Sequence, residues 1–188
     1  MKYFVFIVFD EPEIVGVLDF LVEVMNGKRW KAPPHLTIQG PLESRPTSEH
    51  IDGIKERLAS DEILIANPGI FTTKSGVALY LSVNSQNLKK VWNKPEYPIA
   101  KYGFNPHLTI YEGPDIKKAQ RAYDFLKSGF YRIELICRKY SVVPYASKQL
   151  ELFPVHEVQG DENAITRLIG LGKVSSSFRA AFMQAVNS

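Results

Sequence analysis

Two copies of one pentapeptide hold the residues of this chain that are best suited to chemistry. The sequence Pro-His-Leu-Thr-Ile stands at 34–38 and again at 106–110, 72 residues later, and a Gly-Pro pair follows each copy at 40–41 and 113–114. Histidine has a reference pKa near 6.5, so its imidazole accepts or donates a proton near neutral pH. An imidazole and a hydroxyl that recur together indicate acid–base chemistry at a duplicated site, since an internal repeat marks a duplicated architecture.

Strand geometry decides how these side chains are presented. The residues after each proline are apolar and β-branched, which predicts a strand whose side chains alternate between two faces. His35 and Thr37 then share one face, His107 and Thr109 share the equivalent face, and the leucines and isoleucines lie opposite. Two such strands facing each other bring two imidazoles and two hydroxyls around one point. Tyr111 continues the alternation and is expected on the same face as His107.

The surrounding elements form a repeating pattern. Each half places its histidine strand between two helical segments and finishes with a hairpin, which predicts an α+β fold with two pseudo-symmetric lobes and the histidine strands side by side at their boundary. We expect strands at about 3–9, 35–40, 62–71, 76–83, 106–112, 131–143 and 148–155, and helices at about 12–26, 47–60, 87–92 and 114–128.

The chain divides into a bilobal domain over 1–155 and a C-terminal appendage over 156–188. The appendage does not fit the repeat, and we expect it to be helical, with helices from 161–163 to 169 and from 175 to 186. A packed structural role is the favoured interpretation, with a lid or a dimer element as alternatives.

Composition leaves the class of substrate open. The chain has 188 residues, 45% of them hydrophobic, and a net charge of +3, without the run of like charge that marks a nucleic-acid-binding tail. The single Cys137 is compatible with a reducing compartment. The apolar stretch at 3–9 runs into an acidic segment without a cleavage site, and no stretch approaches the roughly 20 apolar residues of a membrane span, so we expect a cytoplasmic, soluble protein.

On these residues the chain resembles the 2H phosphoesterase superfamily, within the group of 2′-5′ RNA ligase-like proteins and cyclic phosphodiesterases. That family carries two His-x-Thr/Ser motifs, which correspond here to 35–37 and 107–109, and the resemblance covers about residues 1–155. The later segment with Ser141, Pro144 and Tyr145 is similar to the family's closing hairpin. The resemblance implies antiparallel sheets that flank a central cleft, with helices on the outside.

The resemblance also implies a metal-independent phosphodiesterase without a cofactor. One histidine would act as general base and the other as general acid, in an order that the symmetry leaves open. Thr37 and Thr109 would donate hydrogen bonds to the non-bridging phosphate oxygens. The implied substrate is a 2′,3′-cyclic phosphate or a 2′-5′ phosphodiester of an RNA end or a small nucleotide, with RNA ligation as the reverse reaction. We expect a monomer.

The residues that would contact the rest of the substrate are less clearly indicated by the sequence than the two motifs. Candidate phosphate contacts are Lys31, Lys74 and Lys101, and candidate stacking surfaces for a base are Trp30, Tyr111 and Tyr145. For each of them, a solvated surface charge or a core aromatic side chain is the alternative interpretation.

The same residues bear on several other possible functions. Two histidines lack the third and fourth ligands of a metal site, and neither a glycine-rich phosphate loop nor a Gly-x-Ser-x-Gly turn is present. His50 and His156 have no matching pattern and are interpreted as surface residues. The remaining alternatives are a structural role for the two motifs, a module that binds RNA ends or nucleotides without cleaving them, and the same chemistry on a substrate that is not RNA.

Overall fold

The computed structural model describes residues 1–28, 32–74, 76–128, 133–146 and 175–188, which form an α+β fold with two antiparallel sheets. One sheet has the order β2-β1-β7, and the other has the order β5-β4-β3-β6. The strands are β1 (Tyr3–Phe9), β2 (His35–Leu42), β3 (Ile63–Thr73), β4 (Gly76–Asn84), β5 (His107–Gly113), β6 (Glu134–Cys137) and β7 (Tyr140–Ala146). The helices are α1 (Pro12–Asn26), α2 (Ser48–Leu58), α3 (Leu88–Val91), α4 (Ile99–Tyr102), α5 (Ile116–Lys127) and α7 (Ser175–Asn187).

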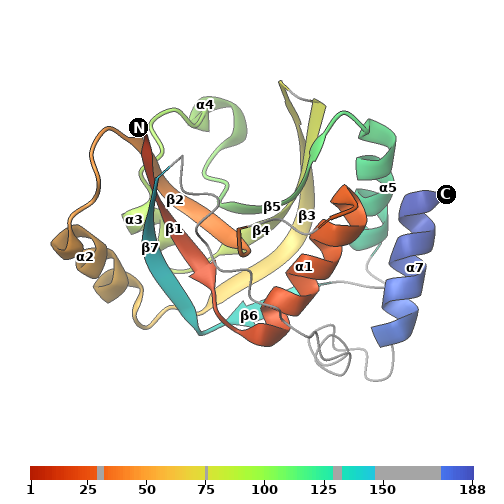
Figure 1. Ribbon diagram of the computed structural model, residues 1–188, viewed down its shortest axis with the longest axis horizontal. Helices are drawn as coiled ribbons and strands as arrows, with labels where there is room; N and C mark the ends of the chain where they lie inside the picture. The colour runs from red at the N-terminus through yellow and green to blue at the C-terminus, as the bar shows by residue number, and fades with distance from the viewer. Residues whose placement is uncertain (29–31, 75, 129–132, 147–174) are drawn as a thin grey trace.

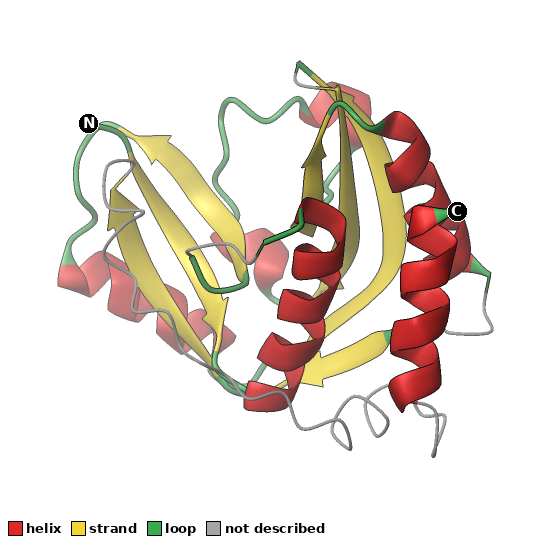
Figure 2. Ribbon diagram, turned by 45° about the vertical axis from the view of Figure 1, so that its right-hand side comes forward, coloured by secondary structure: helices red, strands yellow, loops and turns green. Residues whose placement is uncertain are grey.

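The two sheets stand next to each other, with α2 on the outer side of the first and α5 and α7 on the outer side of the second (Figures 1 and 2). In the second sheet, Asn67 has a φ of 49° and forms a bulge in β3 between the residues that pair with Ser82 and Leu81. A bulge increases the local bend and twist of a strand, so β3 curls along its length (Figure 1).

The two sheets do not correspond to the two halves of the chain. The β3–β4 hairpin of the first half pairs with β5, the histidine strand of the second half. The predicted strand 131–143 is broken in two, because the backbone N–H groups of Arg138 and Lys139 donate to Glu11 Oε1 at 2.6 and 3.0 Å instead of joining a ladder. The chain crosses between the sheets there, so β6 pairs with β3 and β7 pairs with β1. The predicted strand 148–155 lies outside the described residues.

One buried hydrophobic cluster joins the core faces of both sheets to the helices. The helix α1 contributes buried residues at helical spacing to this cluster. It is capped by Gly27, whose φ of 70° lies in the left-handed region that favours glycine. Lys118 of α5 donates to the carbonyl oxygens of Val24 and Met25 at 3.0 and 2.8 Å, so it binds the C-terminal end of α1, where the helix dipole is negative. Asn26 Nδ2 donates to Ile110 O at 2.9 Å and fixes that end of α1 to β5.

The C-terminal helix is part of this core. The predicted helix from Ser175 is confirmed as α7, and its Phe178, Phe182 and Val186 side chains are fully buried. Arg121 of α5 donates to Val186 O at 2.8 Å and satisfies a carbonyl of the last turn. The predicted helix at 161–169 lies outside the described residues.

A buried carboxylate joins the end of α2 to the residues just before α3. Asp61 is 7% exposed and accepts hydrogen bonds from the backbone and side-chain nitrogens of Asn87, both at 2.7 Å, and from the hydroxyl of Ser85. Burial opposes ionisation of Asp61, but these hydrogen bonds outweigh it and hold its pKa below the usual range. Among the described helices, none has the length and apolar character needed to cross a membrane.

Candidate active site

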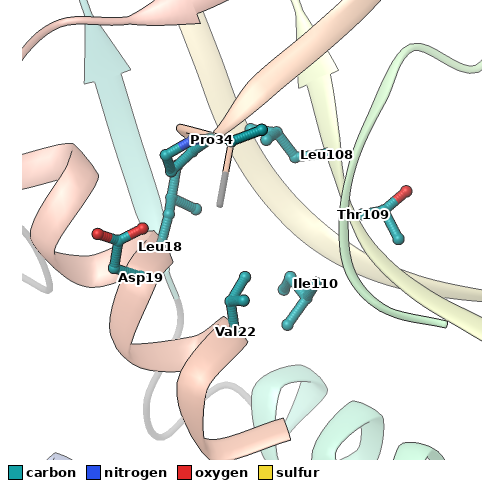
Figure 3. A pocket seen from close by; sticks show the side chains of 8 residues that line it. Leu18, Asp19, Val22, Pro34, Leu108, Thr109 and Ile110 are labelled. Carbon is teal, nitrogen blue, oxygen red and sulfur yellow. The ribbon is translucent and has the colours of Figure 1, made fainter. Parts of the chain in front are cut away.

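The two motif strands lie at the edges of their sheets and contact each other. The strand β2 is an edge of the first sheet, β5 is an edge of the second, and residues of the two strands are in contact. The predicted faces are confirmed: the leucine and isoleucine of each motif are buried, whereas the histidine and threonine are partly exposed. Figure 3 shows Leu108 and Ile110 pointing toward Leu18 and Val22 of α1, and Thr109 pointing to the opposite side of β5.

Both motifs contain the same irregularity directly after the threonine. In the first sheet Phe6 pairs with Thr37 and Val5 pairs with Gln39, which leaves Ile38 as an extra residue. In the second sheet Tyr80 pairs with Thr109 and Leu79 pairs with Tyr111, which leaves Ile110 as the extra residue. A bulge of one residue shifts the following side chains to the other face. The repeat therefore extends to backbone geometry.

The bulge overturns the expected position of Tyr111. Its side chain lies in the core at 7% exposure, on the face opposite His107, so the prediction that it shares the histidine face is wrong. Its hydroxyl accepts a hydrogen bond from the backbone N–H of Asp115 at 3.0 Å, just before α5. Tyr111 is thus a structural residue that binds the start of α5.

The two imidazoles are oriented by equivalent hydrogen bonds. His35 Nδ1 lies 2.9 Å from Pro33 O, and His107 Nδ1 lies 2.7 Å from Asn105 O. A carbonyl oxygen only accepts, so Nδ1 must carry the hydrogen in each pair. In the neutral ring the lone pair is then on Nε2, which is the nitrogen that accepts a proton as a base and donates it as an acid.

Aromatic side chains form the surroundings of His35. Phe6 stacks on the His35 ring with 4.2 Å between centroids, and Tyr145 stacks on Phe6 at 4.8 Å. Tyr145 is 5% exposed, so its ring supports Phe6 and leaves little area for a base to stack on.

The surroundings of His107 are also aromatic. The rings of Phe71, Tyr80 and Tyr97 lie 5.4, 5.0 and 6.2 Å from the His107 ring. Tyr80 is fixed by Asn105, whose Nδ2 donates to the Tyr80 hydroxyl at 3.1 Å. Asn105 therefore orients His107 through its carbonyl oxygen and the neighbouring tyrosine through its side chain.

Burial lowers the pKa of both histidines below 6.5, because desolvation disfavours the charged ring. The hydrogen bond from Nδ1 to a carbonyl opposes this effect in both. At His107 the positive charge of Lys94 lowers the pKa further. The surroundings of the two histidines are therefore alike in geometry and differ in charge.

Lys94 is the site residue that sequence reasoning missed. Its Nζ lies 5.2 and 5.3 Å from the ring centroids of Trp92 and Tyr97, and burial lowers its pKa. The available signal was a lysine between two aromatic residues in the proline-rich segment after α3.

Trp30 and Lys31 lie outside the described residues. Lys101 is exposed on α4, with its Nζ 4.9 Å from the Tyr102 ring, and Lys74 is exposed in the turn after β3. His50 is exposed as expected, and its Nε2 lies 2.7 Å from Gln39 Oε1.

A small pocket lies on the core side of β5, between this strand and α1 (Figure 3). Its lining is mostly apolar and includes Leu18, Val22, Pro34, Leu108 and Ile110. Thr109, which shares a face of β5 with His107, also lines the pocket, whereas neither imidazole does. No group of three histidine, cysteine, aspartate or glutamate side chains that could hold a metal ion occurs in the part of the chain that the structure describes.

The chain matches no model of a protein family, and no curated protein matches its sequence significantly.

Proposed function

We propose that this protein is a metal-independent phosphodiesterase that uses His35 and His107 as its acid–base pair. The observation that carries the proposal is the identical local structure of the two motifs. Each histidine is bonded through Nδ1 to the carbonyl two residues earlier, each motif has its bulge at the isoleucine, and each strand is the edge of its sheet. A structural role for the motifs does not require this agreement in the orientation of two titratable rings.

The proposed fold is that of a bilobal 2H phosphoesterase-like protein. The contact between β2 and β5 and the exposure of His35, Thr37, His107 and Thr109 on the faces away from the core support a central cleft between the sheets. The positions of α2, α5 and α7 support the expected arrangement with helices on the outside (Figure 2).

The proposed reaction is hydrolysis at phosphorus. One neutral histidine takes a proton from the attacking water at Nε2, and the oxygen of that water forms a bond to phosphorus. The bond from phosphorus to a ribose oxygen breaks, and the second histidine, protonated at Nε2, gives its proton to that oxygen. The hydroxyls of Thr37 and Thr109 donate hydrogen bonds to the non-bridging oxygens, where negative charge is held.

The proposed substrate is a 2′,3′-cyclic phosphate or a 2′-5′ phosphodiester of an RNA end or a nucleotide. The partly exposed aromatic side chains beside His107 support a ligand that carries a nucleobase, because bases stack on such rings. Because the two histidines supply both proton-transfer groups, the proposed mechanism requires no metal ion.

The test is hydrolysis of a 2′,3′-cyclic mononucleotide with a chelator present. General acid–base catalysis contributes about 10²- to 10⁴-fold, so His35→Ala and His107→Ala should each lose activity on that scale. Glu56→Ala is the control, because Glu56 is exposed on α2, outside the motif strands, and should keep the wild-type rate.

Full activity in either motif variant would contradict the two-histidine mechanism, and loss of activity with the chelator would contradict metal independence. A wild-type protein that binds a nucleoside 2′-monophosphate but turns over neither cyclic nor 2′-5′ linked substrates would be a binding module.

A further inference from the structure

The segment that follows α3 is attached along the edge of β2. Asn93 N donates to Ile38 O, and Gly40 N donates to Asn93 O, both at 2.9 Å. The side chain of Gln39 donates to Val91 O at 3.0 Å. Three hydrogen bonds thus hold the backbone on both sides of Trp92 against the first histidine strand, and Lys94 follows directly.

The ammonium of Lys94 lies on the aromatic side chains beside the other histidine. It lies over the Trp92 and Tyr97 rings, and Tyr97 lies 6.2 Å from the His107 ring. The side chain is only partly exposed. The ion pairs formed among the described residues involve other lysines and arginines, so no described carboxylate neutralises Lys94 within 4 Å.

A desolvated ammonium without a carboxylate partner is an expensive arrangement. The aromatic faces recover part of the cost, since a cation is attracted to the ring quadrupole. An anion bound beside His107 would recover the rest, and Lys acts as a point charge toward phosphate.

From this placement we propose that Lys94 is a phosphate-binding residue, which contacts a non-bridging oxygen of a phosphate ester held between the two histidine strands. The inference rests on the proposed function and adds a substrate-binding residue to the same site. It also removes the symmetry of the two motifs, because no charged neighbour among the described residues acts on the pKa of His35.

Lys101 is the alternative cation, and the structure disfavours it. Its side chain is exposed and lies over Tyr102, so water already solvates its charge. A phosphate gains less from a fully solvated charge than from a desolvated one.

The experiment compares Lys94→Met, Lys94→Arg and the control Lys89→Met. Methionine keeps the apolar stem that packs near the rings, and Lys89 is an exposed lysine on α3. Binding of inorganic phosphate and of a nucleoside 2′-monophosphate is measured by calorimetry, KM and kcat are measured on a cyclic mononucleotide, and the histidine pKa values are measured by NMR.

In Lys94→Met we expect at least about tenfold weaker binding of both anions and a KM raised by about the same factor. Lys94→Arg should recover most of the binding, and Lys89→Met should equal wild type. The pKa of His107 should rise in Lys94→Met, because a positive charge is removed. The pKa of His35 should not change.

The two proposals fail in different ways. Unchanged anion binding and KM in Lys94→Met, with turnover intact in wild type, would overturn the role of Lys94 alone. Absence of phosphate binding in wild type would also overturn it. Anion binding that depends on Lys94, in a protein without turnover, would overturn the phosphodiesterase and support the inference.

Discussion

Replacing Gly69 by alanine tests how closely the aromatic surroundings control His107. Gly69 pairs with Tyr80 across β3 and β4, and the Tyr80 ring lies directly over it. A Cβ at Gly69 would lie 2.2 Å from Tyr80 Cζ and 2.4 Å from its hydroxyl oxygen. Carbon atoms in contact are about 3.5 Å or more apart, so the ring must withdraw by about 1.3 Å.

The displacement would reach the imidazole. Tyr80 lies 5.0 Å from the His107 ring and accepts a hydrogen bond from Asn105, which in turn orients His107. Overpacking costs about 1–3 kcal/mol of unfolding free energy, which lowers Tm by roughly 2–12 °C for a chain of this size. A displacement of about 1 Å at a catalytic group can cost 10²-fold, so we expect kcat to fall by about 10- to 100-fold.

The assay is thermal unfolding together with hydrolysis of a cyclic mononucleotide. Gly53→Ala is the matched control, because a Cβ at this position in α2 meets no atom within 4 Å. That change should stabilise the protein by about 0.5–1 kcal/mol and leave turnover unchanged. In a Tyr80→Ala background the stability cost of Gly69→Ala should disappear. A Gly69→Ala protein with wild-type Tm and kcat would refute the reasoning.

Three further predictions follow from the pKa values. Because burial lowers the pKa of both His35 and His107, kcat/KM should peak below about pH 6.5, falling at lower pH as the base is protonated and at higher pH as the acid loses its proton; a maximum above pH 7.5 would contradict the assignment. Burial raises the pKa of the Cys137 thiol to about 12, so iodoacetamide at pH 8 should label it only after unfolding, as read by mass spectrometry, and rapid labelling of the native protein would contradict its burial. Asp61→Ala should cost about 1–3 kcal/mol in denaturant titrations at pH 7. Folding lowers the pKa of Asp61, so its contribution to the free energy of unfolding is present above the unfolded pKa of about 3.9 and is lost as the pH falls through the folded pKa. A difference in unfolding free energy between variant and wild type that stays constant down to pH 2 would contradict this.

The parts of the structure that the sequence predicted depend on local geometry. His35 and Thr37 share a face because side chains alternate along any strand, and the start of α5 was readable because Asp115 accepts a hydrogen bond from the N–H of Lys118 at 2.9 Å. The same reasoning placed Tyr111 wrongly, because nothing in the local pattern reports the bulge at Ile110.

The parts that escaped prediction depend on pairings between distant segments. The break in the strand after Cys137 comes from Glu11, far away in the sequence, which accepts two backbone hydrogen bonds there. Lys94 reaches the site because Asn93 is bonded to β2. Its segment reads as a proline-rich connection until that pairing is known. The predicted contacts of Trp30 and Lys31 stay predictions.

The pairing of β7 with β1 has a consequence for synthesis on the ribosome. The strand β1 is the central strand of its sheet, yet one of its two partners extends to Ala146. Until that residue leaves the exit tunnel, one edge of β1 has no partner, and Phe6 lacks the Tyr145 ring that covers it. The first histidine strand emerges before β7, so its surroundings are completed only once β7 has also left the tunnel. A nascent chain stalled before this point would present an open sheet edge beside exposed aromatic side chains, the kind of surface that chaperones bind.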